Sequence, residues 1–191
     1  MPPTMIALVG EQPLPVLIPL LHYQPCSTIL LASPETREVA QTIIQVLAEH
    51  KYPAPVELHD EPISRHDPTI TYAVCTSLLD TIGEESVLVN ISGGSKMTSA
   101  AAAMAAHDFR SDVVYVISEG TGRIVRWTHD TYFVEPFDVD ISLEMRFACL
   151  GYEITPRKLE WKAQFFAVAA EIATFAAWDG STPWLCELNK F

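Results

Sequence analysis

The stretch that most constrains the fold runs from Ser86 to Ala106, with the sequence SVLVNISGGSKMTSAAAAMAA. Its first part, Ser86–Ile91, is mostly apolar and rich in valine, leucine and isoleucine. An apolar run of this length is typical of a parallel strand in the centre of a sheet that is covered on both faces. A glycine turn and an alanine-rich helix follow directly. The order predicts a strand-turn-helix unit whose turn lies at the carboxyl end of a central strand.

The turn after this strand has the composition of an anion-binding loop. In the glycine loop, Ser92–Lys96 (SGGSK), the two glycines can take positive φ and let a ligand approach the backbone closely. Its serines offer hydroxyl groups and helix caps, and Lys96 adds a positive charge. The N–H groups at the start of a helix from about Met97 point back at the loop. The pattern predicts a site for phosphate or a nucleotide.

The spacing excludes two familiar nucleotide-binding motifs. A Walker-type loop needs Gly-Lys followed by Ser or Thr, but Ser95 separates Gly94 from Lys96. A dinucleotide fingerprint needs G-x-G-x-x-G, whereas this turn has adjacent glycines and no third one. An ordinary tight turn with a solvated Lys96 stays open as the alternative, because a lone glycine pair is a weak signal.

The rest of the chain alternates short strands with helices. Strands are predicted at Met5–Val9, Thr28–Ala32, Pro55–Leu58 and Val113–Ile117, and helices at Val16–Tyr23, from Ser33 to about His50, from Asp67 to near Gly83, from about Met97 to near Phe109, and at Ile141–Leu150. Arg123–Trp127 and Tyr132–Val134 are predicted to form a hairpin. This order predicts an α/β, Rossmann-like three-layer sandwich with a mostly parallel central sheet, an antiparallel edge hairpin and C-terminal helices.

Three of the predicted loops end at the same edge of this sheet. Ligands of open α/β sheets bind outside the carboxyl ends of the strands. Gly10–Pro15 follows the first strand, Ser33 follows the second, and the glycine loop follows the central strand. We expect these segments, which are far apart in the sequence, to form one binding site.

Composition narrows the partners and the location. The 191 residues are 49% hydrophobic, which is enough for one globular domain and a short appendage. The formal charge of −12 argues against binding long DNA or RNA, since that affinity comes from many lysines and arginines. The start, MPPTMIALVG, lacks the features of a signal peptide, and no apolar run reaches the roughly 20 residues of a membrane span. We expect no association with a membrane.

The cysteines indicate a reducing compartment. Cys26, Cys75, Cys149 and Cys186 are far apart and form no C-x-x-C pair. Their surroundings are mostly apolar, so we expect reduced core thiols rather than a disulfide framework or a zinc site. Such thiols predict a cytoplasmic protein.

Two motifs of the chain resemble the CRISPR-associated Rossmann fold (CARF) domains, which sense cyclic oligoadenylates. Asn90–Met97 (NISGGSKM) is similar to that family's Asn-x-Thr-Gly-Gly-Thr-Lys motif, with serine in place of both threonines. Leu8–Pro15 resembles the first-strand loop of CARF effectors that carry a nuclease domain, and Ser33–Thr36 resembles their second-strand loop. The resemblance covers residues 1–150. Residues 151–191 are then predicted to be a helical C-terminal extension, with a helix that opens at Thr155 and Pro156.

The resemblance implies a homodimer whose two pockets face each other across a two-fold axis and hold one cyclic tetra-adenylate, with the six-membered ring as the alternative. It implies that the glycine loop contacts phosphate and ribose, while Gln12 and its neighbours line or close the adenine pockets. The predicted ligand-binding residues are Gly10, Glu11, Gln12, Pro13, Ser33, Ser92, Gly93, Gly94, Ser95, Lys96, Met97 and Thr98.

Several roles stay open for such a chain: a free-standing sensor, a shortened effector, or a ring nuclease. In a ring nuclease a ribose 2′-OH attacks the adjacent phosphodiester, and Lys96 and Ser95 are the predicted catalytic residues, stabilising the developing charge and positioning the ribose. That reaction needs neither a metal nor a cofactor, and none is predicted. A generic mononucleotide-binding protein, or an interaction subunit that docks a partner through its tail, are the alternatives outside the family.

Overall fold

The computed structural model describes residues 2–83, 86–117, 122–137, 139 and 141–152. They belong to one compact unit, Met1–Ile154. The helix predicted from Thr155, and with it almost all of the predicted extension 151–191, lies outside the described residues. The predicted division of the chain after residue 150 therefore stays a prediction.

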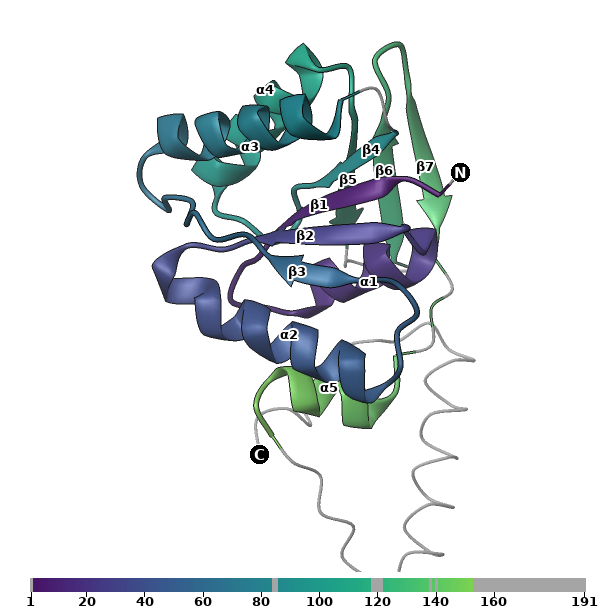
Figure 1. Ribbon diagram of the computed structural model, residues 1–191. Coiled ribbons are helices and arrows are strands. Elements are labelled where there is room, and N and C mark those ends of the chain that lie inside the picture. The colour runs from purple at the N-terminus through teal and green to yellow at the C-terminus, as the bar shows by residue number, and fades with distance from the viewer. Residues whose placement is uncertain (1, 84–85, 118–121, 138, 140, 153–191) are drawn as a thin grey trace, which may run out of the picture. The chain divides into compact units, whose positions relative to one another are not determined.

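A seven-stranded sheet forms the middle layer (Figure 1). Its strands are β1 (Thr4–Leu8), β2 (Ser27–Leu31), β3 (Val56–Leu58), β4 (Val87–Asn90), β5 (Asp112–Ile117), β6 (Arg123–Trp127) and β7 (Tyr132–Pro136). They lie in the order β3-β2-β1-β4-β5-β6-β7. The first five pair in parallel, and β6 and β7 add an antiparallel edge. β4 is thus the central strand, as its continuous apolar run predicts.

Helices cover both faces of the sheet (Figure 1). On one side lie α1 (Leu14–Tyr23), α2 (Arg37–Glu49) and α5 (Leu143–Cys149), and on the other lie α3 (Pro68–Ile82) and α4 (Lys96–Asp108). Alternate residues of each strand feed the two cores: Leu88 and Val114 pack towards α1 and α2, whereas Val89 and Val113 pack towards α3 and α4. The predicted Rossmann-like three-layer sandwich is confirmed.

Three helices begin differently from their prediction, and one of them, α5, starts at Leu143 rather than Ile141. α1 starts at Leu14 rather than Val16, because Pro15 in the first turn costs no hydrogen bond. The helix predicted from Ser33 is divided into a short 3₁₀ turn, η1 (Pro34–Thr36), and α2. The earlier start of α1 brings helical structure closer to the carboxyl end of β1.

The cysteines follow the prediction in part. Cys75 and Cys149 are buried and free, and burial raises the pKa of Cys75 to about 12 and that of Cys149 to about 11. Cys26 is also free but exposed, so the prediction of a core thiol is wrong there. It lies just before β2, where its N–H donates to the carbonyl oxygen of Pro3 at the sheet's amino edge. Cys186 lies outside the described residues.

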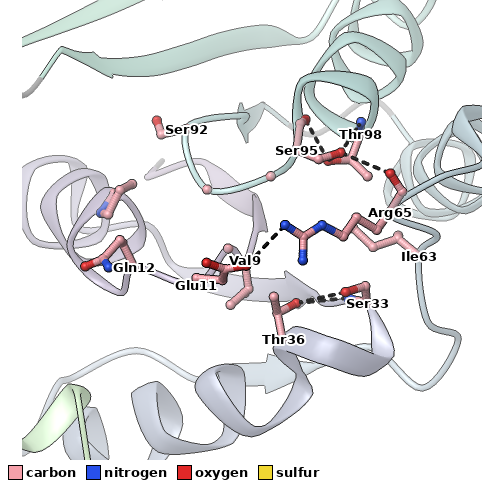
Figure 2. Close-up of a pocket in the computed structure, with 14 residues that line it drawn as sticks. Val9, Glu11, Gln12, Ser33, Thr36, Ile63, Arg65, Ser92, Ser95 and Thr98 are labelled. Carbon is pink, nitrogen blue, oxygen red and sulfur yellow. Dashed lines mark hydrogen bonds and ion pairs between the residues drawn. The ribbon is translucent and has the colours of Figure 1, made fainter.

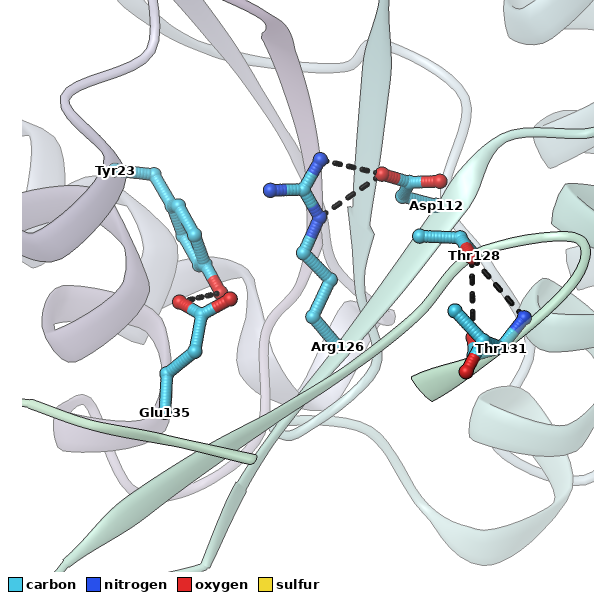
Figure 3. Close-up of polar contacts among 6 residues, drawn as sticks. All are labelled: Tyr23, Asp112, Arg126, Thr128, Thr131 and Glu135. Atoms are coloured by element: carbon cyan, nitrogen blue, oxygen red, sulfur yellow. Dashed lines mark hydrogen bonds and ion pairs between the residues drawn. The ribbon is translucent and has the colours of Figure 1, made fainter. Parts of the chain in front are cut away.

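Polar contacts join the antiparallel hairpin to the rest of the unit (Figure 3). Arg126 of β6 donates from Nε and Nη2 to Oδ2 of Asp112 in β5, at 2.9 and 2.6 Å. Tyr23 at the end of α1 donates to Oε2 of Glu135 in β7 at 3.2 Å. Burial, and after it the charge of Glu135, raises the pKa of Tyr23, so the phenol keeps the proton that it donates. α1 thus follows directly on the segment after β1 and, at its other end, contacts the β6–β7 hairpin.

Candidate functional site

The candidate site is a pocket at the point where the strand order reverses. β1 and β4 lie side by side, but the chain continues from β1 to β2 and from β4 to β5, which lie on opposite sides of the pair. Loops diverge at such a switch point and leave a crevice at the carboxyl ends of the strands. In this protein the crevice is an open pocket of about 310 Å³ (Figure 2). Its lining residues are Val9, Gly10, Glu11, Gln12, Pro15, Ser33, Thr36, Ile63, Arg65, Ser92, Gly93, Gly94, Ser95 and Thr98.

The segment after β1, Gly10–Pro15, is called the first loop, and its backbone touches that of the glycine loop directly. A Cβ atom on Gly10 would overlap the carbonyl oxygen of Gly93, and a Cβ on Gly93 would overlap the carbonyl oxygen of Leu8. A Cβ on Gly94 would overlap the Thr98 hydroxyl. Positive φ, the reason expected from the sequence, is not what these glycines supply, since the described glycines with positive φ are Gly83, Gly122 and Gly151. The glycines are needed here because the two loops approach so closely.

Asn90, the last residue of β4, holds the floor of the pocket in place. Its side chain is completely buried. Nδ2 donates to the carbonyl oxygen of Pro15 at 2.9 Å, and Oδ1 accepts from the N–H and the hydroxyl of Ser92 at 3.0 and 2.6 Å. The Ser92 hydroxyl in turn accepts from the N–H of Val116 in β5 at 2.9 Å. One amide thus joins α1, the glycine loop and the neighbouring strand.

Pro19 explains why the Pro15 carbonyl is free to accept this bond. In a regular α-helix the carbonyl of residue 15 accepts from the N–H of residue 19. Pro19 lies inside α1 and has no N–H, so the helix cannot supply that bond. Asn90 provides the missing donor. Pro19 therefore creates the point at which the central strand attaches to α1.

Ser95 joins the glycine loop to the start of α4. Its hydroxyl accepts from the N–H of Thr98 at 3.2 Å, as an N-cap does. The same hydroxyl donates to the backbone carbonyl oxygen of Arg65 at 3.3 Å (Figure 2). Ser95 therefore also holds the loop between β3 and α3 against the pocket.

Ser33 closes the pocket on the side of β2. It is buried, and its N–H donates to the hydroxyl of Thr36 at 3.1 Å, which fixes the short turn η1 (Figure 2). The hydroxyl of Ser33 also interacts with Glu35 and is the main cause of the lowered pKa of that carboxyl. Ser33 is thus both the N-cap residue of η1 and a lining residue of the pocket.

The structure brings most of the predicted ligand-binding residues together in the pocket, and three of them do not line it. Those that line the pocket are Gly10, Glu11, Gln12, Ser33, Ser92, Gly93, Gly94, Ser95 and Thr98. Pro13, Lys96 and Met97 are not among the lining residues. The side chains of Lys96 and Met97 are exposed, because both follow the N-cap on the outward side of the first turn of α4. Their predicted roles stay predictions.

The charged residues on the wall, within the described part of the chain, are Glu11 and Arg65. Nη2 of Arg65 lies 3.1 Å from Oε1 of Glu11 (Figure 2). Arg65 is not among the predicted site residues, because residues 59–67 are polar and turn-rich and carry no motif. The available signal was topological: this segment follows the carboxyl end of β3 and therefore reaches the same edge of the sheet.

Other kinds of site find no support in the described residues. Over the described ranges, no group of three or more His, Cys, Asp or Glu side chains is placed to hold a metal ion. Among the helices that the structure describes, none has the length and apolar character needed to cross a membrane.

Comparisons with known proteins identify similar folds but no similar sequences. No family model matches the chain, and no curated protein sequence does. Among solved structures, Can2 from Sulfobacillus thermosulfidooxidans in complex with cyclic tetra-adenylate has a TM-score of 0.70 at 22% identity, over 98% of this chain and 49% of Can2. VC1899 from Vibrio cholerae has a TM-score of 0.65 at 12% identity, over 76% of this chain and 38% of that protein.

A third structure is a type III CRISPR defence DNA nuclease activated by cyclic oligoadenylate. Its TM-score is 0.55 at 21% identity, over 94% of this chain and 28% of the nuclease. The chain thus spans about half of Can2 and less of the other two. At these identities the comparisons show the fold alone: the chain has a Rossmann-like α/β fold similar to those of these proteins.

Removing the Asn90 amide tests its place in the site. We expect Asn90→Ala to lower the free energy of unfolding by about 1–3 kcal/mol, because the Pro15 carbonyl and the Ser92 N–H lose their partner. Urea unfolding of the full chain measures this change. The control is the same substitution in a Pro19→Ala background, which restores an N–H at position 19. We expect a smaller cost there, and an equal cost in both backgrounds contradicts the assignment.

Proposed function

We propose that this CARF-like chain is a sensor that binds cyclic tetra-adenylate in type III CRISPR signalling. The observation that carries the proposal is the pocket itself, which gathers the first loop, Ser33 and the glycine loop at one sheet edge. These are the segments that resemble CARF domains. Two proteins with similar folds, Can2 and the CRISPR nuclease, are described as bound to or activated by cyclic oligoadenylate, which supports the same ligand class here.

The wall of the pocket suits both the phosphate and the base of a nucleotide. The N-terminus of α4, a helix of 13 residues, directs its dipole at the glycine loop and favours a phosphate there. Val9 and Ile63 give an apolar surface, and the Gln12 amide offers a donor and an acceptor to the edge of a base. A volume of 310 Å³ is at the low end for ligand pockets, about 300–1,000 Å³. A ring of four nucleotides would need two such pockets.

The second pocket would come from a second copy of the chain. α4 carries an outward stripe of Met97, Ala100 and Met104, at the spacing of one helix face. Beside it, the core under α3 and α4 includes Val113 of β5 but no described residue of β6 or β7, so this face of the hairpin is left uncovered by those helices (Figure 1). We call the two together the α4–hairpin surface. Its exposed large apolar side chains are Met97, Met104, Tyr115, Trp127, Tyr132 and Val134.

This surface is the proposed dimer interface. Met104 and Tyr132 expose 63% and 62% of their area, and contiguous apolar surface of this kind marks an interaction site. The stripe begins at Met97, in the first turn of the helix that starts at the glycine loop. A two-fold axis through that region would set two pockets side by side, as an evenly numbered ring requires.

Cleavage of the ring is the second candidate activity, and the geometry favours binding over it. The Ser95 hydroxyl is already engaged with Thr98 and Arg65, and Lys96 is not a lining residue. For Ser95 to position a ribose it would have to give up a cap. A sensor therefore fits the described site better than a ring nuclease. The two candidate activities differ in one measurable outcome, which is whether the bound ring stays intact.

Ring binding is the direct test of the sensor. We expect calorimetry in EDTA to detect cyclic tetra-adenylate binding, with AMP competing only weakly because it fills one pocket of the pair. HPLC of the same sample over hours is expected to return the intact ring. Linear products ending in a cyclic phosphate would support the ring nuclease instead. If neither this ring nor the six-membered ring binds, the sensor proposal fails and the generic nucleotide-binding protein is the remaining alternative.

A charge placed in the α4–hairpin surface tests the dimer. We expect Met104→Glu to weaken self-association at least tenfold, because the two-fold axis brings each new charge near its copy. Sedimentation velocity measures the association. The matched control is Ile70→Glu, on an exposed part of α3 outside this surface, which should leave the dimer unchanged. Equal effects of the two substitutions would contradict the assigned interface.

A further inference from the structure

Arg65 is the one cation on the wall of the pocket among the described residues, and its position is fixed by its neighbours. Ile63 is buried, and its N–H donates to the carbonyl oxygen of Ala32 at 3.1 Å, so the loop after β3 runs alongside the end of β2. The Thr71 hydroxyl donates to the Ser64 carbonyl at 3.3 Å, and the Ser95 hydroxyl donates to that of Arg65 at 3.3 Å. The backbone of Arg65 is thus held on both sides.

The side chain of Arg65 crosses the pocket from this fixed backbone. Figure 2 shows it between Ser95 on one side and Ser33 and Thr36 on the other, with its guanidinium directed at Glu11. The side chains of Arg65 and Glu11 remain 45% and 72% exposed. An ion pair exposed to this degree stabilises a fold very little. The Glu11 carboxylate is therefore readily displaced by an anion that binds the Arg65 guanidinium more tightly.

A second carboxylate lies within the field of Arg65. The guanidinium is among the groups that lower the pKa of Glu35, which keeps that carboxyl charged at neutral pH. The ion pair with Glu11 already offsets the positive charge that Arg65 would offer to an incoming anion. Binding must first release the guanidinium from Glu11.

We propose that Arg65 is the phosphate-binding cation of this pocket and that Glu11 occupies it until a ligand phosphodiester takes its place. The inference rests on the proposed function and names the regulation of that same site. A guanidinium presents a planar pair of donors that matches a phosphate as well as a carboxylate, so the exchange needs no rebuilding of the loop. Glu11 then acts as a built-in competitor, which a weakly bound monoanion displaces less well than a ring with several phosphates.

The test is the affinity of the full chain for cyclic tetra-adenylate in matched variants. We expect Arg65→Gln to weaken binding about tenfold or more, because a hydrogen bond to a charged group is lost. Arg65→Lys should keep part of the affinity, since it retains the charge without the paired donors. Glu11→Gln should strengthen binding roughly two- to fivefold, the scale of an exposed ion pair.

Controls separate these effects from a general change of charge. Arg146→Gln on α5 and Glu38→Gln on α2 remove the same charges at exposed positions outside the pocket and should leave the affinity unchanged. In the Arg65→Gln background, Glu11→Gln should no longer strengthen binding. Thermal unfolding of each variant confirms that it is folded.

Each result bears on a separate claim. If the parent chain binds the ring and Arg65→Gln binds it as tightly as Arg146→Gln does, the inference is overturned while the proposed function stands. If Glu11→Gln raises the affinity as much in the Arg65→Gln background as in the parent chain, the competitor role of Glu11 is overturned. If the parent chain binds no ring, the proposed function itself fails, and this inference fails with it.

Discussion

The hydrogen bonds of the buried Asn90 side chain are the constraint on which the site depends. They connect the central strand to the start of α1 and to the glycine loop, and through Ser92 to β5. The contact is possible because Pro19 leaves the Pro15 carbonyl without a helical partner. The close approach of Gly10 to Gly93 then follows, since the two loops are held at backbone contact.

Much of this arrangement could be predicted from the sequence because it depends on local patterns. The continuous apolar run of β4 identified the central strand, and the alternation of strands and helices identified the sandwich. The topological rule for α/β sheets then indicated that the first loop, Ser33 and the glycine loop would meet. Each of these steps uses periodicity or chain order, which are properties that a sequence carries directly.

What could not be predicted depends on side-chain direction and on contacts between distant segments. The resemblance implies that Lys96 contacts the ligand, which stays a prediction, but the sequence does not show that its side chain is exposed in the first turn of α4. Arg65 lies on a loop without a motif, and its role follows only from the hydrogen bonds that hold it beside Glu11. Cys26 has apolar neighbours in sequence, but it lies at an exposed edge in the fold.

The stoichiometry of ring binding tests the central claim most directly. The account describes half of a two-fold site in each chain, with a pocket of about 310 Å³ that suits part of a ring. Calorimetric titration of the full chain with cyclic tetra-adenylate is therefore predicted to reach equivalence at one ring for every two chains. Equivalence at one ring per chain, with the protein monomeric in the bound state, would contradict it.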